Sequence, residues 1–170
     1  MMIRSVENKD YKSIDKVIYE AFLNSEHGYN NENDLVHNLR KEEDYNNYFE
    51  IVAENYNNDI VGHAMLSTIN ISDHLGMALA PISVMPDYQN NGIGSLLMNE
   101  IEQRATKKDV QFISILGDPN YYGRFGYLSA SKYRISAPFE VEDKYFMIKP
   151  LFENGLKNVT GTVEYNQSFN

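Results

Sequence analysis

The first half of the chain alternates between two spacings of apolar residues. Residues 3–6 can form a short strand, and helical spacing then follows twice, with Asn8 or Asp10 as the cap of the first helix. The apolar positions of these two patterns are Ile14, Val17, Ile18, Ala21 and Phe22, and then Leu35, Val36 and Leu39. Residues 48–55 and 60–71 are typical of strands, and the turn residues between them at 57–59 predict an antiparallel hairpin.

A third apolar run, residues 79–85, ends at Pro86, which cannot donate a hydrogen bond to a continuing strand. After a glycine turn, an amphipathic helix is predicted with a buried stripe of Ile93, Leu96, Leu97, Ile101 and Ala105. The remaining pattern predicts strands at 110–116, 133–137, 145–149 and 160–165, and a brief helix at 121–125. We therefore expect one α/β domain over residues 1–170, with a core in 1–150 and a C-terminal strand extension in 151–170.

Composition narrows the chemistry. The chain has no cysteine, which excludes disulfides, thiolate zinc sites and a cysteine-bound acyl intermediate. A net charge of −9 argues against a nucleic-acid partner. No signal-peptide pattern or membrane-length apolar run is found, so we expect a cytoplasmic protein with no membrane partner. The four histidines lack metal-ligand spacing, and no metal is expected.

The negative charge is concentrated in residues 26–59, where nine acidic residues face only Arg40 and Lys41. Two interpretations stay open for this stretch: a negative rim that attracts a cationic amine, or a solvated acidic face. Residues 81–108 hold three acids and three bases, so an anionic ligand meets less repulsion there.

The segment with the clearest chemistry is residues 89–95, Gln-Asn-Asn-Gly-Ile-Gly-Ser, between a predicted strand and a predicted helix. Glycine lets the backbone approach a ligand closely, and the first amides of a helix have no intrahelical acceptor. Such a helix start can bind a phosphate or pyrophosphate without any lysine. A lone G-x-G is also typical of a simple turn. The Walker pattern is excluded because Ser95 follows Gly94, and the dinucleotide fingerprint because its third glycine is missing.

Two motifs in this chain resemble those of a known family. Val84-x-Pro86-x-x-Gln89-x-x-Gly92-x-Gly94 resembles the acetyl-CoA-binding motif of the GNAT N-acetyltransferases. The segment 117–127, Gly-Asp-Pro-Asn-Tyr-Tyr-Gly-Arg-Phe-Gly-Tyr, is similar to one that marks the YhbS-like branch of that family. The resemblance covers nearly the whole chain. It implies a GNAT fold: a mixed, mostly antiparallel sheet of about six to seven strands, flanked by about four helices and splayed at the CoA site.

The resemblance also implies an activity, the transfer of an acetyl group from acetyl-CoA to a primary amine of a small molecule or peptide. With no cysteine, the amine would attack directly in a ternary complex. The implied cofactor-binding residues are Ile82, Val84, Gln89, Asn90, Asn91, Gly92, Ile93, Gly94, Ser95 and Asn120. Main-chain groups at 82 and 84 would bind the pantetheine arm, and the amides of 90–95 the pyrophosphate. Gln89 would shape the loop or contact a phosphate, and Asn120 would line the pantetheine channel or serve a turn.

Tyr122 is the implied catalytic residue, as the general acid. A phenol with a pKa of about 10 stays protonated at neutral pH and can protonate a departing thiolate, whose pKa resembles the value of about 8.5 for cysteine. Core packing is the alternative role for Tyr122, and Tyr121 is the alternative acid. Arg124 would either reach a CoA phosphate or pair with Asp118.

The general base is not identified by the sequence. Residues 77–85 contain no carboxylate, and the candidates that remain are His63, His74 and Glu50. This gap motivates a second hypothesis, a non-catalytic acyl-CoA-binding sensor or interaction module. Transfer to a hydroxyl group and assembly as a homodimer also stay open.

Overall fold

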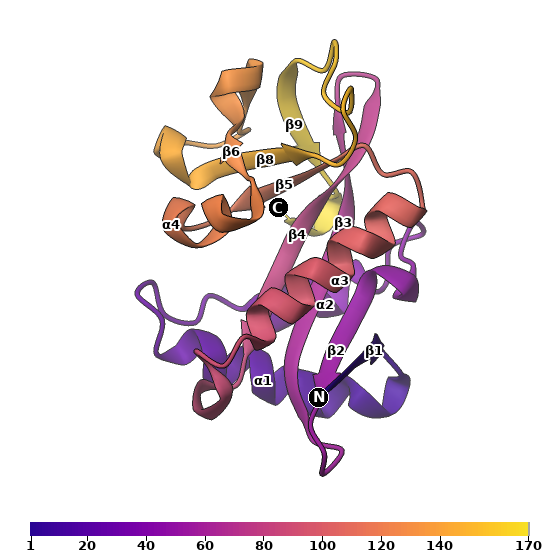
Figure 1. Cartoon of the computed structure of the whole chain (residues 1–170), viewed down its shortest axis with the longest axis vertical. Coiled ribbons are helices and arrows are strands. Elements are labelled where there is room, and N and C mark those ends of the chain that lie inside the picture. The colour runs from indigo at the N-terminus through magenta and orange to yellow at the C-terminus, as the bar shows by residue number, and fades with distance from the viewer. Residues whose placement is uncertain (170) are drawn as a thin grey trace. The chain divides into compact units, whose positions relative to one another are not determined.

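The computed structural model describes residues 1–169 (Figure 1). Within that range, nine strands form a mixed and mostly antiparallel sheet, and there are four α-helices. The strands are β1 (Met2–Ser5), β2 (Glu50–Glu54), β3 (Ile60–Ile71), β4 (His74–Val84), β5 (Phe112–Leu116), β6 (Leu128–Ser129), β7 (Ile135–Ser136), β8 (Phe146–Pro150) and β9 (Gly161–Tyr165). The helices are α1 (Tyr11–Leu23), α2 (Glu32–Leu39), α3 (Ile93–Lys107) and α4 (Pro119–Tyr122). Among the described residues, no helix is both long and apolar enough to cross a membrane.

The contacts group the chain into two compact units. The first comprises Met1–Leu66 and Ala80–Ala105, and the second Ser67–Leu79 and Thr106–Asn170. The long strands β3 and β4 contribute residues to both units.

In the first unit, β1 pairs with β2 and β2 with β3, both antiparallel. Asn58 has a φ of 65° in the turn between β2 and β3, so the predicted hairpin is confirmed. α3 covers one face of this hairpin, because a Cβ atom at Gly62 would lie 3.0 Å from Leu97 and 3.2 Å from Ile93. Since successive side chains of a strand alternate between faces, His63 points to the opposite face, behind which Figure 1 shows α1 and α2.

The predicted stripe of α3 needs one correction. Its buried residues are Ile93, Leu97, Met98, Ile101 and Ala105, whereas Leu96 is 45% exposed. At 100° per residue the buried positions span an arc of about 140°, and Leu96 lies about 60° outside it. The missed member of the stripe is Met98.

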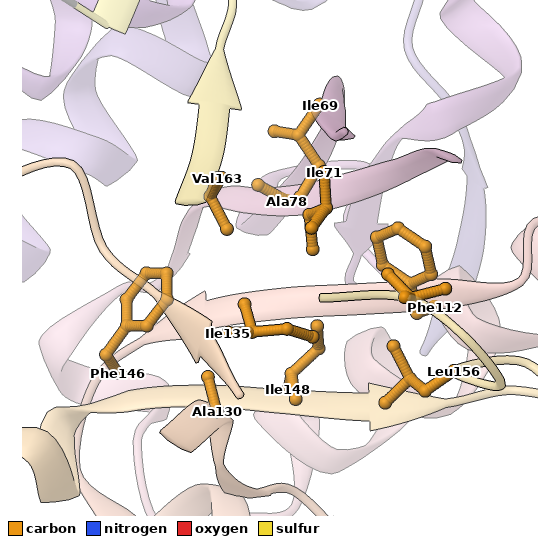
Figure 2. Close-up of a cluster of buried hydrophobic side chains, with 11 residues drawn as sticks. Ile69, Ile71, Ala78, Phe112, Ala130, Ile135, Phe146, Ile148, Leu156 and Val163 are labelled. Atoms are coloured by element: carbon orange, nitrogen blue, oxygen red, sulfur yellow. The ribbon is translucent and has the colours of Figure 1, made fainter. Parts of the chain in front are cut away.

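The second unit packs strands around its own core. β4 pairs in parallel with β5 at Met77↔Ile113 and Ala78↔Ser114, and β8 pairs antiparallel with both β5 and β6. β9 pairs with the end of β3 and with β7. The cluster between these strands, shown in Figure 2, consists of buried residues that include Ile69, Ile71, Phe112, Phe146, Ile148 and Val163.

The start of β4 differs from the prediction. The strand begins at His74, five residues before the predicted start at 79, because Ser72 takes a φ of 51° and closes a tight turn directly after β3. Gly76 escaped the apolar pattern because it has no side chain. It is buried under the ring of Phe112.

Candidate functional site

The loop between β4 and α3 is held by its own side chains. Nε2 of Gln89 donates a hydrogen bond to the carbonyl oxygen of Val84 at 3.0 Å. Nδ2 of Asn91 donates to the carbonyl oxygens of Gln89 at 3.1 Å and Tyr88 at 3.3 Å. Asn90 and Gly92 have positive φ values of 62° and 82°, which the two residue types tolerate best. The loop is therefore fixed without using the amides that follow it.

Those amides belong to the start of α3. The first α-helical bond runs from the amide of Leu96 to the carbonyl oxygen of Gly92, at 3.0 Å. The four amides of residues 92–95 thus have no acceptor within the helix. Gly92 is exposed, and a Cβ atom there would meet nothing within 4 Å. A helix of 15 residues adds the positive end of its dipole, so the arrangement can bind an anion.

Tyr122 lies in the second unit, in α4. The carboxylate of Asp118 caps this helix by accepting a hydrogen bond from the amide of Asn120 at 2.9 Å. The half-buried ring of Tyr122 packs edge-on against Tyr121, with centroids 4.9 Å apart. Burial raises the pKa of the Tyr122 phenol, and the nearby Tyr121 and Asp118 raise it further, so the phenol keeps its proton well above neutral pH.

Arg124 shows a contact that the sequence did not predict. Its guanidinium lies 4.6 Å from the ring centroid of Tyr121, and its Nε donates to the carbonyl oxygen of Tyr121 at 3.3 Å. Arg124 therefore stiffens the turn that carries the two tyrosines.

The ring of Tyr122 packs directly against the backbone of Gly117. A Cβ atom at residue 117 would lie 2.3 Å from that ring, so only glycine leaves room for it. We expect Gly117→Ala to push the ring aside and lower the turnover of the reaction proposed below by about 10²-fold. The matched control is Gly123→Ala, where a Cβ atom meets nothing within 4 Å and φ is an ordinary −57°. Steady-state rates of both variants check this, and equal rates would contradict it.

Two of the candidate bases, Glu50 and His63, meet in a buried group that we call the Glu50 cluster, which comprises Arg40, Tyr45, Glu50 and His63. Nε2 of His63 lies 2.9 Å from Oε1 of Glu50. Arg40 donates to both carboxylate oxygens, with its closest contact at 2.6 Å, and the Tyr45 hydroxyl donates to Oε2 at 2.6 Å. The side chains of Glu50 and His63 are fully buried.

The cluster keeps Glu50 ionised. Burial acts to raise the pKa of Glu50, but hydrogen bonds from His63 and Arg40 outweigh it and hold the pKa at about 2. Burial and the neighbouring carboxylate raise the pKa of Tyr45. With Glu54 also buried and paired with Arg4 at 2.7 Å, the acidic stretch is not uniformly a solvated face. His74, the third candidate base, lies half-buried at the start of β4 in the second unit.

The sequence of this chain matches a known protein family. The acetyltransferase (GNAT) family matches residues 16–127. The chain belongs to this family. The uncharacterised N-acetyltransferase YhbS of Escherichia coli K12 is 27% identical over 100% of this chain and 99% of its own length.

Solved structures of the family agree with the fold. The GNAT N-acetyltransferase YhbS from Escherichia coli in complex with CoA has a TM-score of 0.86 and 25% identity, covering 99% of this chain and 91% of its own. A GNAT acetyltransferase from Brucella melitensis in complex with acetyl-CoA has a TM-score of 0.78 and 25% identity, covering 99% and 97%. The GNAT fold predicted from the sequence is confirmed.

Proposed function

We propose that this chain is an N-acetyltransferase that moves an acetyl group from acetyl-CoA to a primary amine of a small molecule or peptide. The observation that carries the proposal is the start of α3, where four amides without intrahelical acceptors follow a loop fixed by Gln89 and Asn91. The CoA and acetyl-CoA complexes of the two GNAT structures support this choice of anion.

Each donor-binding residue has a role in the proposal. The amides of residues 90–95 bind the pyrophosphate, and main-chain groups of Ile82 and Val84 bind the pantetheine arm. Both of these strand residues are half-buried, so their side chains anchor the strand. Asn120 has the least support among these residues. Its backbone amide donates a hydrogen bond to the Asp118 carboxylate, which favours the alternative role in the turn.

The proposed reaction is a direct attack. The amine nitrogen forms a bond to the thioester carbonyl carbon, the carbon–sulfur bond breaks, and the electron pair leaves with sulfur. Tyr122 protonates that sulfur, and its phenolate takes back the proton that the nitrogen loses as the amide forms. Burial raises the pKa of the Tyr122 phenol, so the phenol is protonated when the thiolate leaves. The chain has no cysteine to carry the acetyl group, which favours a ternary complex.

Two measurements test the proposal. Melting temperature is followed with CoA, acetyl-CoA and longer acyl-CoAs, and at 100 times Kd a ligand should stabilise the fold by about 2.7 kcal/mol. Thiol release from acetyl-CoA is then followed over polyamines, aminoglycosides, amino acids and peptides. Acceptor-dependent release supports the enzyme. CoA binding with no release from any acceptor would favour the sensor hypothesis, and a flat melting response would overturn both.

A further inference from the structure

Among the buried side-chain polar atoms of the first unit that have no hydrogen-bond partner within residues 1–169, two lie on β3 and β4. They are Nδ1 of His63 and Oγ of Ser83, whose residues are 0% and 4% exposed. Leaving a buried donor or acceptor unsatisfied costs about 1–3 kcal/mol each. Groups retained at that cost are candidates for a functional role.

His63 and Ser83 lie on the adjacent strands β3 and β4. The amide of Met85 donates to the carbonyl oxygen of Val61 at 2.8 Å, which sets the antiparallel register of these strands. Ser83 lies two residues before Met85, and His63 lies two residues after Val61. In this antiparallel register Ser83 is therefore opposite His63. Directly opposed residues share a face, with Cβ atoms about 4.5–5.5 Å apart.

That face is the one that holds Glu50. His63 pairs with Val52 on its other side, and Val52 and Glu50 are two residues apart on β2. The ionised and titratable groups that surround His63 from the neighbouring elements are Arg40, Tyr45 and Glu50, with Tyr11 beneath the Arg40 guanidinium at 3.9 Å. Three buried groups therefore run in order across β2, β3 and β4, namely Glu50, His63 and Ser83.

The chemistry of Glu50 fixes the proton on His63. A carboxylate only accepts hydrogen bonds, so Nε2 of His63, 2.9 Å from Glu50, carries the hydrogen. Nδ1 then carries the lone pair, and it makes no hydrogen bond with Ser83 in this structure. A serine hydroxyl can accept one proton while it donates another, so it can pass a proton to that lone pair.

We propose that Ser83 and His63 form a proton relay that deprotonates the acceptor amine. The inference rests on the proposed function. The ammonium loses a proton to the Ser83 oxygen, the hydroxyl proton moves to Nδ1 of His63, and the nitrogen electron pair becomes free to attack the thioester. The Glu50 carboxylate stabilises the resulting imidazolium, which later releases its proton to solvent. His63 on β3 is then the final proton acceptor, in place of the carboxylate that residues 77–85 lack.

Ser83→Ala is the most direct test, since it removes a single unsatisfied hydroxyl. The variant should melt at the wild-type temperature or above it, because a buried unsatisfied group is lost. Its kcat at pH 7 should fall by about 10²-fold, with an unchanged KM for acetyl-CoA. Towards pH 9.5 the loss should shrink, because the amine then loses its proton to solvent. Ser114→Ala, a strand serine that is 1% exposed in the second unit, is the matched control.

His63→Gln should reproduce the same pH-dependent loss, and its folding is checked by the same melting curve. A loss that is equal at every pH in both variants would overturn the relay, as would Ser83→Ala behaving like Ser114→Ala. The acceptor in these assays is whichever amine of the panel gives the fastest thiol release with wild-type protein.

Failure of the proposed function has a separate signature, the absence of thiol release by wild-type protein with any amine. Nitrogen NMR of the histidine rings then decides the relay alone. The relay requires His63 with its hydrogen on Nε2, and an Nδ1 resonance that Ser83→Ala shifts more than Ser114→Ala does. A hydrogen on Nδ1, or no response to Ser83→Ala, overturns it.

Discussion

Tyr122→Phe is expected to lower kcat by about 10²- to 10⁴-fold, the range that one general acid contributes. The substitution removes the hydroxyl and keeps the ring that packs against Gly117 and Tyr121. The melting temperature and the KM for acetyl-CoA should therefore stay close to their wild-type values. Steady-state thiol release with the best amine of the panel measures the effect.

Tyr121→Phe is the control for that variant. Tyr121 is half-buried in the same short helix, and burial raises its pKa as well. It should retain most of the activity. If only Tyr121→Phe loses activity, Tyr121 is the general acid. If both variants keep full activity, neither tyrosine is the general acid.

Glu50→Gln is expected to lower the free energy of unfolding by about 3–5 kcal/mol. The reason is that Arg40 would remain in the interior without a counter-charge. Urea denaturation measures the change. Glu43→Gln, an exposed position of the same acidic stretch, should change stability by no more than about 0.5 kcal/mol. Equal stabilities for the two variants would contradict the role given to the Glu50 cluster.

The Glu50 carboxylate also makes the stability of the fold depend on pH. Its pKa falls from an ordinary 4.5 to about 2 on folding, so its contribution is complete above pH 4.5 and is lost as the pH falls towards 2. At 1.36 kcal/mol per unit, the contribution is about 3 kcal/mol. Asp10, whose pKa is lowered chiefly by its hydrogen bond from Arg4, acts in the same direction. Stability curves of wild-type protein and Glu50→Gln should therefore converge between pH 4.5 and 2.

The spacing of apolar residues predicted most of the helices and strands, because that spacing and the turn residues beside it lie within a few residues of each other. The helix before Leu23, the hairpin around Asn58 and the helix after Gly92 all have apolar periodicity and turn residues beside it. The errors arise where the signal is absent or tertiary. Gly76 is buried but has no apolar side chain, so the apolar pattern did not include it in β4. Leu96 matches the helical period but lies outside the buried arc.

The Glu50 cluster shows what a linear pattern misses. Glu50 and His63 are 13 residues apart, and neither motif nor periodicity links them. Counting back from the turn at 57–59 would even place Glu50 and His63 on opposite faces of the hairpin, and the register shift between Ala53 and Glu54 brings them onto one face. The contribution of Arg40 could not be counted in this way, because it depends on how the segment after α2 packs.

The central claim, that the start of α3 binds acetyl-CoA, is tested most directly by calorimetric titration of wild-type protein, Gly92→Ala and Gly28→Ala. Gly92 and Gly28 both have positive φ, 82° and 69°, and at neither would a Cβ atom meet a neighbour within 4 Å. The two variants therefore carry the same backbone strain, and only one lies at the proposed phosphates. The account predicts that Gly92→Ala weakens acetyl-CoA binding by at least about tenfold, or 1.4 kcal/mol, while Gly28→Ala binds like wild-type protein. Equal affinities in all three proteins, or no binding by wild-type protein, would contradict it.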